Sequence, residues 1–212
     1  TRKWLLADSP DSVRDHLLFM RHQWHWHEHV TRYLRTGEGL RIHETFQPLD
    51  WELYRRGMAS TARLSADEVI RKTPLPPRAT RLLDVGGAHG LYASAFCQRY
   101  PALEVDVLDL PDMVTTAPPH ERIRYLAGDV LTFPLGENQY DAVLLCQVSH
   151  HLAAEQNHCL AERAAKALRP GGCHEHSRAL AHLAVEAVHH QLGGLPPARP
   201  GGEVGLARHE AP

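Results

Sequence analysis

A short apolar segment near the middle of the chain runs directly into a glycine-rich turn, Leu82-Leu83-Asp84-Val85-Gly86-Gly87-Ala88-His89-Gly90. The pattern predicts a buried strand, a sharp turn and then a helix over residues 91–100. Glycine lets the backbone bend sharply and approach a bound molecule that side chains would keep away. The first turn of the following helix presents free N–H groups to such a molecule. The segment therefore predicts a ligand-binding turn.

The spacing of the glycines separates two classes of ligand. A dinucleotide-binding loop has the pattern G-x-G-x-x-G, but counting from Gly86 places Ala88 and Leu91 at the second and third glycine positions. The chain instead carries G-x-A-x-G shortly after an acid, Asp84. This favours a nucleoside-type cofactor over a nicotinamide dinucleotide. An ordinary strand–turn–helix without a ligand stays open as the alternative.

Segments with the patterns of strands and helices alternate after residue 78. Strands are predicted at residues 81–85, 104–108, 123–126 and 142–146, and helices at residues 91–100 and 153–168. Such an alternation implies crossover connections, which produce parallel strands. We therefore expect an α/β fold, with a Rossmann-like parallel sheet flanked by helices, over residues 79–172.

A helical segment is expected before this domain and an atypical tail after it. Residues 1–78 are predicted to contain helices at 11–35 and 49–72, and the prolines within 74–77 mark the boundary with the sheet. Residues 173–212 begin with polar sequence where a buried strand would continue the sheet, and later become rich in Gly, Pro and Ala. We expect this tail to be partly disordered and the sheet to be incomplete.

Charge and composition exclude several classes of protein. The 212 residues carry a formal net charge of −2, so an excess of cations that could neutralise phosphates is missing, which argues against a nucleic-acid or membrane-surface binder. No apolar run approaches the roughly 20 residues that span a bilayer. The four cysteines are widely spaced and form no C-x-x-C pair. This usage is typical of a reduced, cytoplasmic protein.

Two further aspartates follow predicted strands. Asp109 closes the second strand, where a carboxylate can accept hydrogen bonds from both hydroxyls of a ribose. Asp129 follows the third strand and could accept a hydrogen bond from an adenine amino group. Each aspartate also fits a turn or capping residue without a ligand. Because the carboxyl ends of parallel strands meet at one edge of a sheet, Asp84, Asp109 and Asp129 are expected to surround one crevice.

This ordered set of motifs resembles the class I S-adenosylmethionine-dependent methyltransferases, specifically the small-molecule O-methyltransferases of the caffeate and hydroxyindole type. The resemblance covers roughly residues 17–172 and includes Trp51-Glu52-Leu53-Tyr54-Arg55-Arg56-Gly57-Met58, which is similar to the linker helix of the family. Its main motifs are Asp84-Val85-Gly86-Gly87-Ala88-His89-Gly90, Leu108-Asp109-Leu110-Pro111, Gly128-Asp129-Val130 and Tyr140-Asp141-Ala142-Val143-Leu144-Leu145. Full-length members begin with a winged-helix and dimerisation region and end with further strands. We therefore expect the chain to be truncated at both ends.

The resemblance implies S-adenosylmethionine as the cofactor. It assigns the glycines of the turn to the methionine part, Asp109 to the ribose, and Asp129 with Val130 to the adenine. Cys146 stands where many relatives have a lysine that contacts the cofactor. The predicted cofactor-binding residues are Asp84, Gly86, Gly87, Gly90, Asp109, Leu110, Asp129, Val130 and Cys146.

A histidine after the fourth strand is the candidate catalytic residue. His150 matches the catalytic histidine of the family, and His151 stands where relatives often have an aspartate. An imidazole with an ordinary pKa near 6.5 suits removal of a hydroxyl proton at neutral pH. A histidine in this turn could instead cap the next helix or border the pocket.

No metal site is predicted. His22, His25, His27 and His29 are close in sequence, and His25 with His29 could share an ion on one helix face. However, no acid or cysteine follows at a spacing typical of a metal site. The segment Cys173-His174-Glu175-His176 offers ligands within irregular sequence only.

The predicted function is methyl transfer from S-adenosylmethionine to a hydroxyl of a small aromatic molecule, with a histidine as general base. The alternative is a catalytically inactive, truncated methyltransferase-like protein that at most binds the cofactor or dimerises. A nicotinamide-dependent oxidoreductase is disfavoured by the loop spacing. The tryptophan-rich N-terminal helices suggest a homodimer, as in the family.

Overall fold

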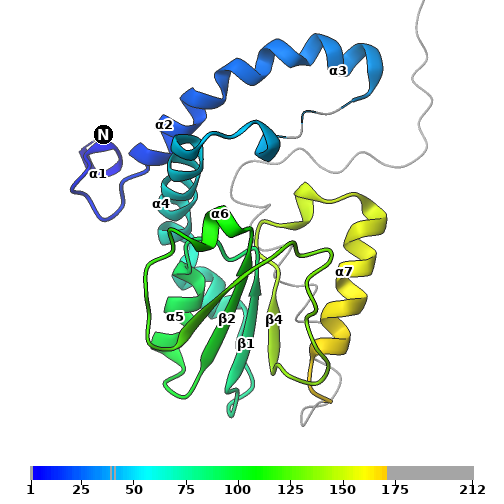
Figure 1. The fold of residues 1–212 in the computed structure, drawn as a ribbon. Helices are drawn as coiled ribbons and strands as arrows, with labels where there is room; N and C mark the ends of the chain where they lie inside the picture. The colour runs from blue at the N-terminus through cyan, green and yellow to red at the C-terminus, as the bar shows by residue number, and fades with distance from the viewer. Residues whose placement is uncertain (1, 39, 41, 171–212) are drawn as a thin grey trace, which may run out of the picture.

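The computed structural model describes residues 2–38, 40 and 42–170, so the tail predicted at 173–212 lies outside the described residues. Helices come first along the chain, and strands begin after residue 80 (Figure 1). The elements before the sheet are α1 (Arg2–Leu5), α2 (Arg14–His22), η1 (Gln23–His29), α3 (Val30–Thr36), η2 (Ile42–Thr45) and α4 (Pro48–Lys72). The following elements are β1 (Arg81–Val85), α5 (Leu91–Arg99), β2 (Glu104–Asp109), α6 (Pro111–Val114), β3 (Ile123–Ala127), β4 (Ala142–Leu144), η3 (Ser149–His151) and α7 (Ala154–Ala167).

The described strands form one parallel sheet in the order β3-β2-β1-β4. In this register Asp84 lies beside Val107 of β2 and Leu144 of β4. The chain returns to β4 after α7, where Leu168 forms an isolated parallel bridge with Tyr140. The predicted α/β fold with a Rossmann-like parallel sheet is confirmed. Each strand agrees with its predicted range to within two residues at either end.

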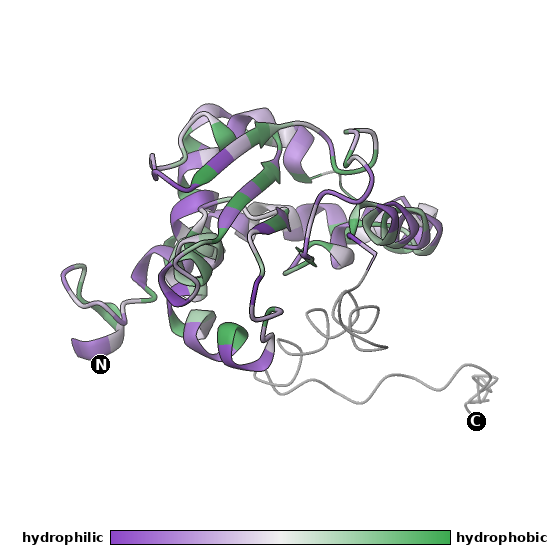
Figure 2. Cartoon of the chain, turned by 90° about the horizontal axis from the view of Figure 1, so that it is seen from below, coloured by the Kyte–Doolittle hydropathy of each residue, from purple (hydrophilic) through white to green (hydrophobic). Residues whose placement is uncertain are grey.

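Helices cover both faces of the sheet. Buried side chains of α4 and α5, such as Val69 and Phe96, pack with Val105 and Val107 on one face. On the other face, Leu160 and other buried residues of α7 pack with strand residues. Figure 2 shows hydrophobic and hydrophilic residues alternating along the outer helices, as expected for helices with one buried side. The sheet is therefore the middle layer of three.

Helix α4 joins the N-terminal segment to the sheet. Its start is stabilised by a capping box, in which the Gln47 N–H donates to Asp50 Oδ2 at 2.8 Å, and Pro48 occupies the first turn. Its first half packs against α2, where a Cβ on Gly57 would come within 3.0 Å of the Phe19 Cβ. Its second half packs against α5. The helix predicted at 49–72 is confirmed. It attaches the N-terminal segment to the sheet domain.

The single helix predicted at residues 11–35 is wrong in two respects. Helix α2 begins at Arg14, and the 3-10 segment η1 separates it from α3. Neither Ser9 nor Asp11 caps the helix, because the Ser9 hydroxyl donates to the Lys3 carbonyl and Asp11 pairs with the Lys3 ammonium at 3.3 Å. These side chains stabilise the preceding turn instead.

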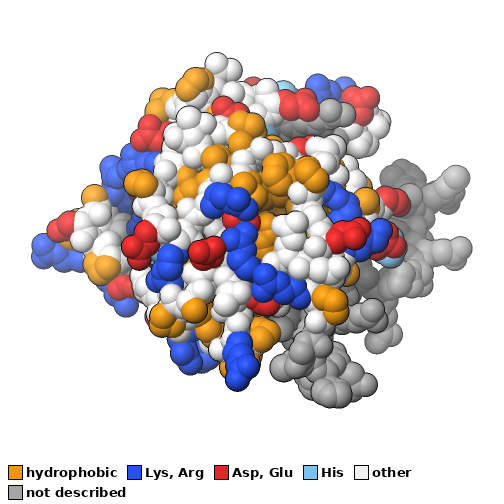
Figure 3. Space-filling model, turned by 60° about the horizontal axis from the view of Figure 1, so that its bottom comes forward, with side chains coloured by type: hydrophobic (Ala, Val, Ile, Leu, Met, Phe, Trp, Pro, Cys, Tyr) orange, Lys and Arg blue, Asp and Glu red, His pale blue; other side chains and the backbone are white. Residues whose placement is uncertain are grey.

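Basic and acidic side chains are interspersed on the face of the molecule that Figure 3 shows, with hydrophobic side chains between them. Within the described residues, no helix is long and apolar enough to cross a membrane.

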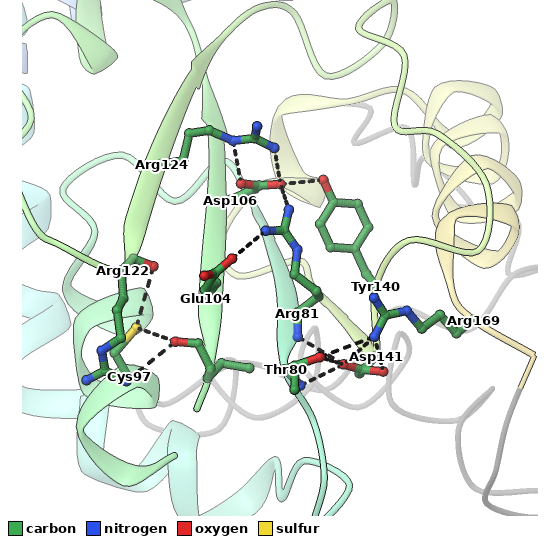
Figure 4. A network of polar contacts seen from close by, with 11 residues as sticks. Thr80, Arg81, Cys97, Glu104, Asp106, Arg122, Arg124, Tyr140, Asp141 and Arg169 are labelled. Atoms are coloured by element: carbon green, nitrogen blue, oxygen red, sulfur yellow. Dashed lines mark hydrogen bonds and ion pairs between the residues drawn. The ribbon is translucent and has the colours of Figure 1, made fainter. Parts of the chain in front are cut away.

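A polar network connects β1, β2 and β3 around the buried carboxylate of Asp106 (Figure 4).

Candidate active site

A cleft of about 450 Å³ opens at the carboxyl edge of the sheet. Its walls come from the ends of all the described strands, from η2 and α4 of the N-terminal segment, and from the start of α7. The residues that line it are Ile42, His43, Glu44, Trp51, Tyr54, Gly86, Asp109, Leu110, Met113, Asp129, Val130, Leu131, Gln147, Val148, His151, Leu152 and Gln156. A parallel α/β sheet is expected to bind ligands at this edge.

The turn after β1 depends on its glycines. Gly86 and Gly90 have φ angles of +71° and +67°, which L side chains rarely adopt. A Cβ on Gly86 would overlap the side chain of Val148, and one on Gly90 would overlap the hydroxyl of Tyr125. Ala88 also has a positive φ of +42°. The turn is thus strained and closely packed on both sides.

Asp109 holds this turn from the end of β2. Its Oδ2 accepts a hydrogen bond from the Ala88 N–H at 2.7 Å, and its Oδ1 accepts one from the Leu110 N–H at 2.7 Å. Burial raises the pKa of the Asp109 carboxyl, while the two N–H donors act in the opposite direction. Each oxygen keeps further acceptor capacity, because a carboxylate has about four lone-pair sites.

Asp84 lies beneath the turn and is fully buried. Neither of its carboxylate oxygens has a hydrogen-bond partner among the described residues. A Cβ on Gly87 would come within 2.5 Å of Asp84 Oδ2, so glycine is needed above the carboxylate. Burial and then the charge of Asp109 raise the pKa of Asp84 to about 7. A buried carboxylate without a partner is costly and points to a missing cation or donor.

The turn after β3 forms the next part of the cleft. The exposed Asp129 accepts a hydrogen bond at Oδ1 from the Leu131 N–H at 2.8 Å. Arg163 of α7 donates to the carbonyls of Val130 and Leu131, at 2.7 Å in both cases, and also to that of Phe133. One guanidinium therefore holds this turn against α7.

The predicted cofactor residues divide into two layers at this edge. The cleft wall includes Gly86, Asp109, Leu110, Asp129 and Val130. A buried layer behind the wall contains Asp84, Gly87, Gly90 and Cys146. Burial, followed by the charge of Asp84, raises the pKa of the Cys146 thiol. All the predicted residues are therefore gathered at the carboxyl ends of β1 to β4.

The histidines after β4 are both exposed, but only His151 lines the cleft. Their ring centroids are 4.0 Å apart. Burial, then the charges of His150 and His43, lower the pKa of His151 to about 4.

Sequence reasoning missed three features of the site. His43 in η2 lines the cleft, and no sequence pattern around it indicated this. Trp51 and Tyr54 also line the cleft, and their spacing of three on one helix was a usable signal. His89 is buried just before α5, where its Nδ1 accepts a hydrogen bond from the Leu91 N–H at 3.1 Å, and burial lowers its pKa to about 4. Within the described residues, no group of three or more His, Cys, Asp or Glu could hold a metal ion.

The parallel sheet, the strained glycine turn and the acids at successive strand ends define a Rossmann-like domain with a ligand crevice. The family model of the O-methyltransferase domain matches residues 28–174. The chain therefore belongs to this O-methyltransferase family.

The chain is also similar to individual proteins and to solved structures. Acetylserotonin O-methyltransferase of Mus musculus is 33% identical over 158 residues, which are 69% of this chain and 38% of the mouse protein. Acetylserotonin O-methyltransferase 1 of Oryza sativa subsp. japonica is 33% identical over 85 residues, 40% of this chain and 23% of the rice protein. The crystal structure of human N-acetylserotonin methyltransferase in complex with SAM superposes with a TM-score of 0.69 and 23% identity, covering 80% of this chain and 53% of the human one. The chain thus spans about half or less of the length of these relatives.

Proposed function

We propose that this chain binds S-adenosylmethionine in the cleft and transfers its methyl group to a hydroxyl of a small aromatic molecule. The observation that carries the proposal is the buried carboxylate of Asp84, which has no partner among the described residues and lies behind the glycine turn. Asp109 and Asp129 follow at the next strand ends of the same cleft. Family membership supports the reaction class.

The residues present fit the cofactor. An α-amino acid group carries an ammonium, which would supply the charge and donors that Asp84 lacks. Of the turn glycines, Gly86 lines the cleft and would approach that end of the molecule, while Gly87 and Gly90 lie buried behind it. Asp109 has acceptor capacity left for the ribose hydroxyls, and Leu110 extends this wall. Asp129 and Val130 are assigned to the adenine, and Cys146 is assigned to the buried layer beside Asp84.

The acceptor is assigned to the side of the cleft that η2 and α4 form. Trp51, Tyr54 and His43 present aromatic rings there, and Ile42 and Met113 add apolar surface. Such a wall suits a flat aromatic molecule, since aromatic rings prefer stacked or edge-to-face contacts. Cofactor and acceptor would then meet between the strand ends and α4.

The chain must align an acceptor hydroxyl with the methyl group and remove its proton. When bound, the cofactor supplies a methyl carbon on a sulfonium, which is already a strong electrophile. Transfer of that methyl group to the acceptor hydroxyl would release the hydroxyl proton, which a histidine of this chain would accept. We assign this role to His150, as the family resemblance implies, with His151 of the cleft wall as the neighbouring candidate. Alignment in a closed cleft contributes several kcal/mol to such a reaction, on the order of 7–11 kcal/mol at best.

Two measurements on the full chain test the function. Calorimetry with S-adenosylhomocysteine measures nucleoside binding, and a methyl donor labelled in the methyl group measures transfer to a panel of phenols. We expect binding and transfer of label to at least one phenol. Binding without transfer would support the alternative, an inactive protein that only binds the cofactor. Binding of a nicotinamide dinucleotide in preference to the nucleoside would contradict the proposal.

We also propose a cytoplasmic location and a homodimer. Cys97, Cys146 and Cys159 are all free thiols, which supports a reducing compartment. The N-terminal helices expose large apolar side chains, including Trp24 at 73% and Leu34 at 76%. Exposed apolar surface of this kind supports self-association. Light scattering of the purified chain measures its mass, and a monomer at micromolar concentration would contradict the dimer.

A further inference from the structure

His43 brings the N-terminal segment into contact with the turn after β4. Its ring lies 5.2 Å from the ring of His151, measured between centroids. On its other sides it stacks on Trp51 at 5.4 Å with an interplanar angle of 22°, and it meets Tyr54 edge to face at 5.4 Å. Phe46 contacts it edge to face at the same distance. The imidazole is therefore held on several sides by rings.

A series of ring contacts connects His43 through His151 to His150, the candidate base. His43 and His151 both line the cleft, and His150 contacts His151. The position of His151 is where the family often has an acid, so an imidazole here takes the place of a carboxylate. A carboxylate would favour the charged form of a neighbouring imidazole, whereas two further imidazoles disfavour it.

The titratable groups around His43 come from three elements. Tyr54 on α4 and His151 on η3 contact its ring, His150 on η3 acts on it through its charge, and Glu44 on its own element lines the same cleft. Burial is the main cause that lowers the pKa of His43, and the charge of His150 is the second. For His151, burial is again the main cause, and the charges of His150 and His43 follow. Three imidazoles this close cannot all carry a proton, because like charges at this separation repel.

We propose that His43 is a positioning residue of the methyl-transfer site, which holds the ring of His151 against the cleft and is electrostatically coupled to it through the contact between the two imidazoles. The inference rests on the proposed function, because His151 is the neighbouring candidate for the base. It assigns to the N-terminal segment a direct part in the chemistry at the carboxyl edge of the sheet. A role limited to packing would require the ring of residue 43 but not its charge.

Two variants separate the ring from the charge. His43→Phe keeps a ring against Trp51 and Tyr54 and removes a charge that lowers the pKa of His151, so the pKa of His151 rises. His43→Ala removes the ring as well, so the ring of His151 is no longer held and kcat falls roughly tenfold at every pH, with little change in cofactor affinity.

A readout that needs no turnover makes the test independent of the proposed function. Titration of the His151 imidazole by NMR, assigned with His151→Gln, is expected to move to higher pH in His43→Phe. His158→Gln, on the exposed face of α7, is the matched control and leaves both the titration and kcat unchanged. An unchanged His151 titration in a folded His43→Phe protein would overturn the proposal. Absence of methyl transfer by the unaltered chain would refute the proposed function alone, and the titration would still decide the coupling.

Discussion

Asp84 and Asp106 are buried on opposite faces of the same sheet, and within the described residues only the Asp106 carboxylate has hydrogen-bond partners. Asp106 on β2 accepts hydrogen bonds from Arg124 Nε and Nη2, both at 2.8 Å, from Arg81 Nη2 at 2.6 Å and from the Tyr140 hydroxyl at 2.7 Å (Figure 4). Asp84 on β1 has no partner within the described part of the chain. The hydrogen bonds of Asp106 connect the strands, whereas Asp84 is the carboxylate that we propose as the partner of the cofactor ammonium.

Asp84→Asn is expected to change stability and binding in opposite directions. It removes an uncompensated buried charge, so the free energy of unfolding of the cofactor-free chain rises at pH 8, by at most about 4 kcal/mol. The same change removes the partner of the cofactor ammonium, so the affinity for S-adenosylhomocysteine falls at least about tenfold. Urea unfolding and calorimetry measure the two effects. Lower stability together with unchanged affinity would contradict the assignment of Asp84.

The pH dependence of this effect has a definite sign. The folded pKa of Asp84, about 7, is above its ordinary value of 3.8. The folded state therefore holds the proton longer than the unfolded state, and stability falls as pH rises between about 4 and 7. The gain from Asp84→Asn should be full at pH 8 and absent near pH 4. Asp129→Asn is the matched control, because Asp129 is exposed and should change stability little.

Asp106→Ala should destabilise the fold and leave binding unchanged. It leaves Arg81, Arg124 and the buried end of Tyr140 without their shared acceptor, which costs about 3 kcal/mol. Because Asp106 faces away from the Asp84 side of the sheet, nucleoside affinity at a temperature where the variant is folded should be that of the unaltered chain. Thermal unfolding and calorimetry test both parts. A variant of unchanged melting temperature would show that the network contributes nothing.

Asp109→Ala should weaken cofactor binding by about 1–3 kcal/mol through lost charge-assisted hydrogen bonds. It also removes the acceptor of the Ala88 and Leu110 N–H groups, so Asp109→Asn, which keeps one oxygen, should lose less. Calorimetry on the pair of variants separates the charge from the support of the turn. If the unaltered chain and both variants bind the nucleoside with equal affinity, Asp109 does not contribute to cofactor binding.

Gly90→Ala should destabilise the turn for two separable reasons. The φ of +67° costs about 1 kcal/mol for a residue with a Cβ, and the overlap with the Tyr125 hydroxyl adds to that cost. Tyr125→Phe removes the overlapping oxygen, so the double variant should be less destabilised than the sum of the single changes. Urea unfolding of the four proteins of this cycle provides the comparison. Strict additivity would show that the oxygen moves aside at no cost.

His150→Ala should reduce turnover and spare cofactor affinity, because a base contacts the acceptor proton and not the nucleoside. Parallel measurements on His151→Ala compare the two members of the pair, of which only His151 lines the cleft. A labelled methyl donor measures turnover, and calorimetry measures affinity. Unaltered turnover in His150→Ala, with loss of turnover in His151→Ala, would show that His151 and not His150 is the base.

The sequence alone predicted the sheet and the crevice because their determinants are local. Continuous apolar runs such as residues 142–146 identify buried strands, and the glycine turn together with acids at successive strand ends identifies the binding edge. The parallel arrangement then follows from the alternation with helices. In the structure, all the predicted cofactor residues gather at this edge, although their contacts with a cofactor remain predictions.

The parts that sequence reasoning missed depend on tertiary contacts. Residues 11–35 have a helical pattern throughout, but the aromatic cluster that includes Phe19, Trp26 and Phe46 is formed partly by residues outside that pattern. The position of His43 depends on how η2 packs over the turn after β4, which no local motif records. The lack of a partner for Asp84 likewise becomes visible only when its neighbours are known.

The two walls of the cleft come from stretches of chain that lie far apart in the sequence. The strand ends carry the residues assigned to the methyl donor, while η2 and α4 carry most of those assigned to the acceptor. Protein engineers can therefore treat the walls as separate modules. A combinatorial library confined to Ile42, Trp51 and Tyr54 would search for new acceptor preferences and leave the residues assigned to the methyl donor unchanged.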